Sequence, residues 1–176
     1  MPVASPTPST PARGPSHDHR PITSYTGDKV AVNPIAANGD VAQPPTTMLG
    51  TRPHAHSIVP DPSNRYVFAS NLGGDAIMQY RFGSAAGTLT LLASTSVLPQ
   101  GFSGGAPATS ELHVTPDGRF LYVAERTSST IAAFRIDSTT GALSLIGHTP
   151  TETQPRGFGM DPRGRFSWQS AGSPMP

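Results

Sequence analysis

A repeat with a constant period is the feature that most restricts the fold of this sequence. Asn64–Ser70 and Gly118–Ala124 are short apolar runs, each of which follows a turn rich in Pro, Asp, Gly or Asn. Matched positions in the two copies are separated by 54 residues throughout: Arg65 and Arg119, Tyr80 and Phe134, Gly87 and Gly141. Because the offset is constant across three segments, the copies indicate one repeated structural unit.

Each copy contains several short runs rich in β-branched and aromatic residues, separated by turn residues, and we interpret these runs as strands. After the first run come segments 76–82 and 130–136, and then the Gly-led segments 87–91 and 141–145. Three to four antiparallel strands in about 45–55 residues are typical of one β-propeller blade. An ordinary β-sandwich is the alternative, but sandwiches do not repeat in register. The predicted class is therefore all-β, an incomplete β-propeller.

The pattern predicts two complete blades, at about 54–95 and 107–150, and a partial blade on each side, at 26–35 and 159–166. The Pro-rich segment 1–22 is expected to be a disordered tail. We place the partial propeller at 23–166. Segment 167–176, which includes Trp168, has poor strand propensity and is expected to be an exposed tail outside the propeller.

Composition excludes several kinds of function. The net charge is +1, so no strong field attracts nucleic acid or a membrane surface. The chain has no cysteine, which excludes disulfides and Cys-ligated metals. With no apolar run near ~20 residues and no secretory signal, we expect a cytoplasmic protein. His17, Asp18 and His19 could chelate a metal, but two imidazoles on a flexible tail favour a solvated segment without one.

Several motifs resemble those of the propeller-type 6-phosphogluconolactonases, whose family also contains carboxymuconate cyclases. The similarity runs over about residues 24–166, in the order of that family, through segments 53–57, 98–104, 111–119, 125–127, 147–150 and 151–158. The resemblance implies a seven-bladed propeller and hydrolysis of 6-phosphogluconolactone, a small phosphorylated sugar lactone, in the pentose phosphate pathway. It implies no cofactor.

The sequence departs from this family inside the resembling region. The family has a further blade between the Pro-His-Ala-His segment at 53–56 and the Leu-Pro-x-Gly-Phe segment at 98–102. That blade carries a Gly-Pro-Arg-His motif and an Asn-Glu pair that are associated with the active site. Here Thr90 continues directly through Leu91 and Leu92 to Leu98, so we expect one blade to be missing.

Lactone hydrolysis requires an activated water, a stabilised carbonyl oxygen and a group that holds the anion. Histidine suits the first requirement and arginine the others. By match to the family motifs, the resemblance implies His54, His56 and Arg126 as catalytic residues and Arg156 as a substrate-binding residue. The alternatives are backbone-bonded histidines, a solvated loop arginine at 126, and a packing or capping role for Arg156.

Other residues are weaker candidates. Glu111 is a hypothetical replacement for the lost acid, His148 is expected to be structural or solvated, and Arg65, Arg119 and Arg165 recur as turn or strand-edge residues. No phosphate-binding Gly-rich loop, zinc motif or Ser-His-Asp pattern is present.

Four functional hypotheses therefore stay open. They are a lactonase, a non-catalytic truncated relic, a cyclase-like isomerase, and a fragment that self-associates through open blade edges to complete a ring.

Overall fold

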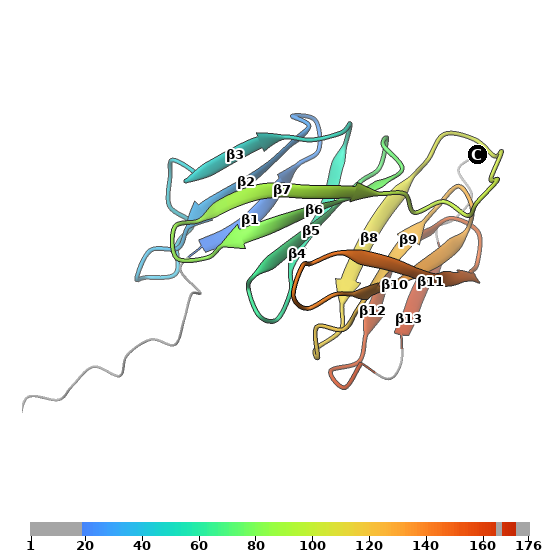
Figure 1. Ribbon diagram of the computed structural model, residues 1–176. Helices are drawn as coiled ribbons and strands as arrows, with labels where there is room; N and C mark the ends of the chain where they lie inside the picture. Colours follow the sequence, from blue (N-terminus) through green and yellow to red (C-terminus); the bar gives the residue numbers. More distant parts are fainter. Residues whose placement is uncertain (1–18, 165–166, 172–176) are drawn as a thin grey trace, which may run out of the picture.

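The computed structural model describes residues 19–164 and 167–171, which form thirteen strands in four antiparallel sheets (Figure 1). The first sheet has the order β1 (His19–Ser24), β2 (Lys29–Pro34), β3 (Thr47–Gly50). The second has the order β4 (Ala55–Pro60), β5 (Tyr66–Asn71), β6 (Ala76–Gly83), β7 (Thr88–Thr95). The third runs β8 (Thr109–Val114), β9 (Phe120–Glu125), β10 (Thr130–Ile136), β11 (Leu143–Pro150), and the last pairs β12 (Pro155–Met160) with β13 (Ser167–Ala171).

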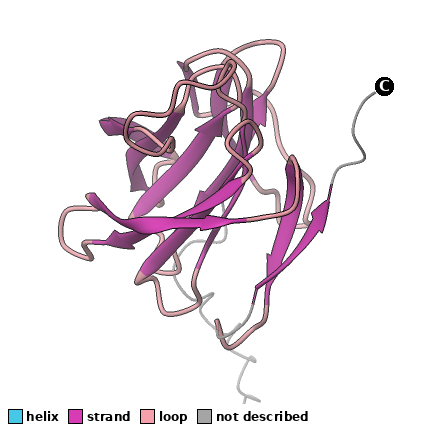
Figure 2. Cartoon of the chain, turned by 90° about the vertical axis from the view of Figure 1, so that its right-hand side faces the viewer, coloured by secondary structure: helices cyan, strands magenta, loops and turns pink. Residues whose placement is uncertain are grey.

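The two complete blades expected from the repeat are confirmed as the sheets β4–β7 and β8–β11. The four sheets follow one another across the molecule, with β4 beside β1 and β8, and β8 beside β12 (Figure 1). All the described elements are strands and loops (Figure 2), and no helix in that part of the chain could span a membrane. The fold is therefore a partial β-propeller.

Strand β5 shows why a blade between two others is buried on both faces. Its residues alternate between two cores, as the period of two in a strand requires. Val67 and Ala69 pack with Val30 and Val32 of the first blade. Tyr66 and Phe68 belong instead to the cluster shared with the third blade. A short continuous apolar run is thus the sequence signature of a strand between two neighbouring sheets.

Two expected boundaries were wrong. Strand β1 begins at His19 and pairs with β2, so residues 19–22 belong to the first blade and not to a tail. Strand β13 pairs with β12, so residues 167–171 continue the last blade despite their poor propensity, because the neighbouring strand supplies hydrogen-bond partners. Residues 1–18 and 172–176, and the exposure expected for Trp168, lie outside the described part.

The expectation that Arg65 and Arg119 are turn residues is confirmed. Arg65 donates to the carbonyl of Ser138 and lies over the ring of Tyr66, and Arg119 lies over the ring of Phe120. Arg165 is outside the described residues.

Candidate functional site

The candidate residues gather at one end of the blades, where first strands begin and turns between second and third strands lie. The register of the first strand is irregular at this end in three successive sheets, between Ala55 and Ser57, Thr109 and Leu112, and Pro155 and Gly157. Such β-bulges re-aim a side chain and are common beside active sites. His56 and Arg156 are the residues inside two of these bulges.

His56 and Arg126 meet across the boundary between two blades. The Nη2 atom of Arg126 lies 3.2 Å from Nε2 of His56, although the residues are 70 positions apart. A guanidinium only donates, so Nε2 must be the acceptor and the ring proton of neutral His56 is assigned to Nδ1. Burial, and then the charge of Arg126, lower the pKa of His56, while Glu111 opposes them. His56 is therefore neutral at neutral pH.

A buried carboxylate fixes the turn that carries Arg126. Glu125 is fully buried, and its side chain accepts the backbone N–H groups of Ala108 and Ser128. The backbone N–H of Arg126 also donates to the carbonyl of Ala108. These bonds tie the β9–β10 turn to the start of β8, which fixes the backbone that carries the guanidinium beside His56.

The positive charges of Arg126 and Arg156 repel each other at this site. Burial lowers the pKa of Arg126, the charge of Arg156 lowers it further, and Tyr25 opposes both effects. Like charges in a partly desolvated place destabilise each other unless an anion lies between them. Arg156 is exposed, and its charge acts on Arg126; two such guanidinium groups suit an oxyanion.

His54 has an unusual backbone conformation. Its φ is +60°, in the left-handed region, and strand β4 begins only at the following residue. His54 therefore lies outside the strand, and the alternation of side chains along β4 does not place its ring beside that of His56. Both rings contact Tyr25, which stacks on His54 with ring centroids 4.6 Å apart and meets His56 edge-on with centroids 6.3 Å apart.

Asp28 holds the backbone of His54 in that conformation. Its Oδ1 accepts the N–H of His54 at 2.7 Å and lies 3.9 Å from the Nδ1 atom of the same residue. Equivalent turns hold the chain in the next blades: Asp75 accepts from the N–H groups of Val97 and Leu98, and Ser129 accepts from that of Gln154. Gln154 repeats the positive φ of His54, at +54°.

Tyr25, Asp28, His54, His56 and Arg126 form a cluster in which several polar atoms are buried without a hydrogen-bond partner among the described residues. They are Nδ1 of His54, Nδ1 of His56 and Nε of Arg126. Buried polar groups in native proteins are almost always satisfied, so unpartnered ones call for an explanation. Three of the eight such atoms in the described residues belong to side chains that sequence similarity singled out.

Glu111 makes structural contacts in this arrangement. Its Oε2 accepts the N–H of Phe158, and its Oε1 lies 3.3 Å from Nε2 of His113, which in turn lies 2.7 Å from the carbonyl oxygen of Phe158. Glu111 thereby ties β8 to β12 while its charge acts on His56. His148 has a structural contact as well, since its Nε2 lies 2.8 Å from the Val97 carbonyl oxygen.

Sequence reasoning missed Tyr25 and Asp28. The repeat contained the signal for both, because the β1–β2 turn is equivalent to the β9–β10 turn. Tyr25 follows β1 as Arg126 follows β9, and Asp28 precedes β2 as Ser129 precedes β10. Positions that face the site in one blade thus predict positions that face it in another.

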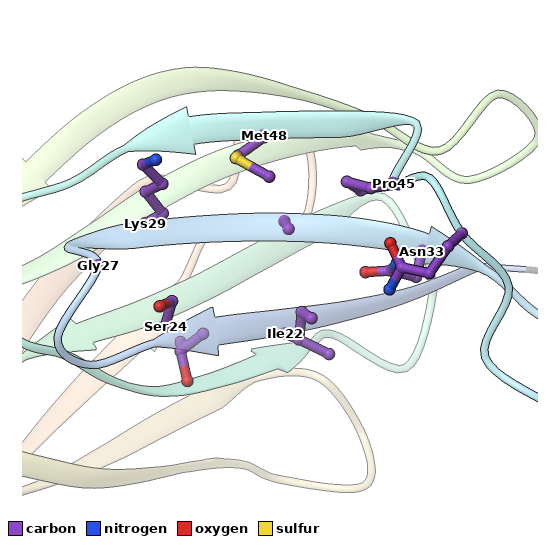
Figure 3. A pocket seen from close by; sticks show the side chains of 10 residues that line it. Ile22, Ser24, Gly27, Lys29, Asn33, Pro45 and Met48 are labelled. Atoms are coloured by element: carbon purple, nitrogen blue, oxygen red, sulfur yellow. The ribbon is translucent and has the colours of Figure 1, made fainter.

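A cavity of about 300 Å³ lies away from this cluster, on the open face of the first blade (Figure 3). Its walls include Ile22, Lys29 and Met48, from three neighbouring strands. Since it contains no candidate residue, we assign it to the exposed blade face and not to the chemistry. Among the described residues, no three His, Cys, Asp or Glu side chains gather in a way that could hold a metal ion.

Comparison with known proteins identifies the fold family. A family model described as lactonase, 7-bladed beta-propeller, matches residues 16–90 and 82–170. A 6-phosphogluconolactonase of Pectobacterium carotovorum is 32% identical over 192 residues, which covers 81% of this chain and 57% of that protein. A 6-phosphogluconolactonase of Serratia proteamaculans is 35% identical over 104 residues, covering 59% of this chain and 31% of that protein. The chain thus spans about half the length of the curated relatives it matches.

Solved structures agree on the fold. A protein from Lactobacillus plantarum superposes with a TM-score of 0.71 at 26% identity, covering 80% of this chain and 41% of that one. A periplasmic gluconolactonase of Pseudomonas aeruginosa superposes with a TM-score of 0.75 at 24% identity, covering 86% and 43%.

The alignment also supports the loss of an internal blade. It spans 192 residues but uses only 81% of this 176-residue chain. Within the aligned range, about 50 residues of the Pectobacterium protein therefore have no counterpart in this chain. That is the size of one blade. The family model, moreover, matches in two parts that meet at 82–90, where the sequence runs directly from one resembling segment to the next. With matches over most of its length, the chain belongs to the seven-bladed β-propeller lactonase family.

Proposed function

We propose that the protein hydrolyses a phosphorylated sugar lactone, 6-phosphogluconolactone, to the open-chain acid, as a cytoplasmic step of the pentose phosphate pathway. The observation that carries the proposal is the contact between His56 and Arg126, which joins two neighbouring blades, and the charge of Arg156 from the next blade acts on Arg126. The names of the relatives supply the substrate class.

The two arginines suit the anionic parts of such a reaction. Their guanidinium groups remain charged at neutral pH and bind oxyanions through paired donors. One anion is the phosphate of the substrate, and the other is the charge that develops on the carbonyl oxygen as water attacks. Preorganised donors at that oxygen stabilise the transition state more than the ground state, which raises kcat.

A histidine of the cluster supplies the base. Water attacks the lactone carbonyl carbon while its proton passes to the imidazole, and the bond from that carbon to the ring oxygen then breaks. The ring oxygen takes the proton back, so the histidine is regenerated and the product is a hydroxy acid.

The test measures ring opening by the acid released, in a pH-stat, with purified full-length chain and freshly made lactone. We expect a rate above spontaneous hydrolysis, and a fall of about 100-fold in kcat/KM for Arg126→Gln, since one oxyanion donor contributes on that order. Arg119→Gln, which lies in a turn outside the cluster, is the matched control and should keep wild-type kinetics. A wild-type rate equal to the spontaneous one would contradict the proposal.

The second candidate is a non-catalytic relic of such an enzyme. The observation that favours it is the missing stretch of about one blade inside the aligned region. In that case Arg126→Gln and the wild-type chain would both leave the lactone to open at the spontaneous rate.

A further inference from the structure

The two histidines of the cluster differ in the surroundings of their ring nitrogens. Nε2 of His56 is occupied by Arg126, while its Nδ1 is buried and has no partner among the described residues. With Nε2 accepting from the guanidinium, the remaining ring nitrogen carries a proton. In this geometry His56 has no lone pair available to accept a proton from water, and its remaining N–H is shielded from solvent.

His54 has the opposite arrangement. Its Nδ1 is buried and lies 3.9 Å from the carboxylate of Asp28. Its Nε2 is not among the buried unpartnered atoms and makes no described hydrogen bond, so it reaches solvent on a side chain that is 46% exposed. A carboxylate beside Nδ1 favours the proton on that atom and leaves the lone pair on Nε2. The 3.9 Å separation is too long for a hydrogen bond, but such pairs are often loose before a ligand binds.

Two contacts and an unusual backbone angle fix the ring of His54. The backbone N–H donates to Asp28, φ is held at +60°, and Tyr25 stacks on the ring with an interplanar angle of 14°. A Cβ added at Gly73 would lie 3.1 Å from Cδ2 of His54, so this glycine leaves the space that the ring occupies. A non-glycine residue in the left-handed region is sparsely populated, and such positions cluster at functional sites.

We propose that His54 is the general base of the site, that Asp28 is its positioning residue, and that His56 positions the guanidinium of Arg126 for the anion. This assignment of roles rests on the proposed lactone hydrolysis. Nε2 of His54 accepts the proton of the attacking water and returns it to the ring oxygen as the carbon–oxygen bond breaks. The guanidinium of Arg126, held through its bond to Nε2 of His56, meanwhile stabilises the oxyanion.

The repeat provides a matched pair of variants for the positioning role. Asp28 and Asp75 occupy equivalent turns, both with positive φ, at +51° and +44°, and both accept backbone N–H groups at the start of the next segment. Asn tolerates this conformation and keeps a side-chain oxygen that can accept the bond. Asp28→Asn and Asp75→Asn therefore remove the same charge from the same kind of turn, but only the first lies beside a histidine.

Steady-state kinetics of lactone opening test the roles, together with inorganic phosphate binding measured by calorimetry. We expect Asp28→Asn to lower kcat about tenfold with KM unchanged, and Asp75→Asn to leave both unchanged. His54→Gln should lower kcat at least 100-fold and keep phosphate affinity. His56→Ala should weaken phosphate binding about tenfold. Thermal melts on the same samples check that each variant is folded.

The result that overturns the assignment is an active wild-type chain in which His54→Gln keeps its kcat while His56→Ala loses it. Equal effects of Asp28→Asn and Asp75→Asn would equally refute the positioning role. In both cases lactonase activity itself would stand. A wild-type chain without activity would remove the proposed function and this assignment together.

Discussion

The imidazole of His56 and the guanidinium of Arg126 lie 3.2 Å apart, and this contact joins the second blade to the third. It has a measurable electrostatic consequence. Burial is the largest cause that lowers the pKa of His56, the charge of Arg126 adds to it, and Glu111 acts in the opposite direction.

We therefore expect Arg126→Gln to raise the pKa of His56 and Glu111→Gln to lower it further. Titration of the ring carbon–proton signals by NMR measures both shifts. Shifts of the same sign in the two variants would contradict the arrangement of charges described above.

Stability should also depend on pH through His56. Its pKa in the folded protein is below the ordinary value of 6.5, so the unfolded chain binds the proton first as the pH falls. The resulting loss of stability begins near 6.5 and continues down to the folded pKa. Urea unfolding across this range should show the loss in the wild-type chain, and His56→Gln should reduce it.

Tyr80 predicts a loss of stability at alkaline pH. Its side chain is buried, its hydroxyl has no hydrogen-bond partner among the described residues, and burial raises its pKa to about 12 from 10.0. Because the folded protein keeps the proton longer than the unfolded chain, stability is complete below pH 10 and falls as the pH rises toward 12. Tyr80→Phe should remove this loss in thermal melts followed by circular dichroism.

Tyr122→Phe is the matched control, because Tyr122 is only partly buried. The same substitution at Tyr80 also removes an unsatisfied buried hydroxyl, so we expect it to be neutral or stabilising by about 1 kcal/mol at neutral pH. Clear destabilisation by Tyr80→Phe would indicate a hydrogen bond that the structure does not have.

Gly141, one of the positions that defined the repeat, has a φ of +75° and lies against the ring of Tyr66. An added Cβ would collide with that ring in a backbone conformation that side chains rarely adopt. We expect Gly141→Ala to destabilise the fold by about 2–3 kcal/mol, as combined strain and overpacking do. Gly147→Ala is the control, since nothing lies within 4 Å of the place that its added methyl group would take. Equal melting temperatures for the two variants would refute the argument.

The open face of the first blade predicts self-association, which we propose as a property of the isolated chain. Ile22 and Met48 are 40% and 54% exposed on this face (Figure 3). Exposed apolar surface and free strand edges favour contact between copies. Met48→Glu should lower the average mass measured by light scattering at a given concentration. Asn38→Glu, at an exposed turn, should leave it unchanged. A wild-type chain that is monomeric at all concentrations would contradict the proposal.

Much of the blade architecture could be predicted because it follows from local patterns. The constant 54-residue offset, the β-branched runs and the glycine at 141 are visible without any tertiary contact. Strand β13 could not be predicted in this way. Its residues have poor strand propensity, and it forms because β12 offers an unpaired edge.

The sequence by itself determined the repeat, the strand class and the family, because each depends on residue types at fixed short spacings. It also named His54, His56, Arg126 and Arg156 through motif similarity, without saying how they meet. Only the tertiary structure decided that Nε2 of His56 faces Arg126, that Asp28 holds His54 and that Tyr25 gathers both rings. Those contacts join residues on different blades, and their geometry depends on bulges and on the packing of sheet against sheet, which no local spacing specifies.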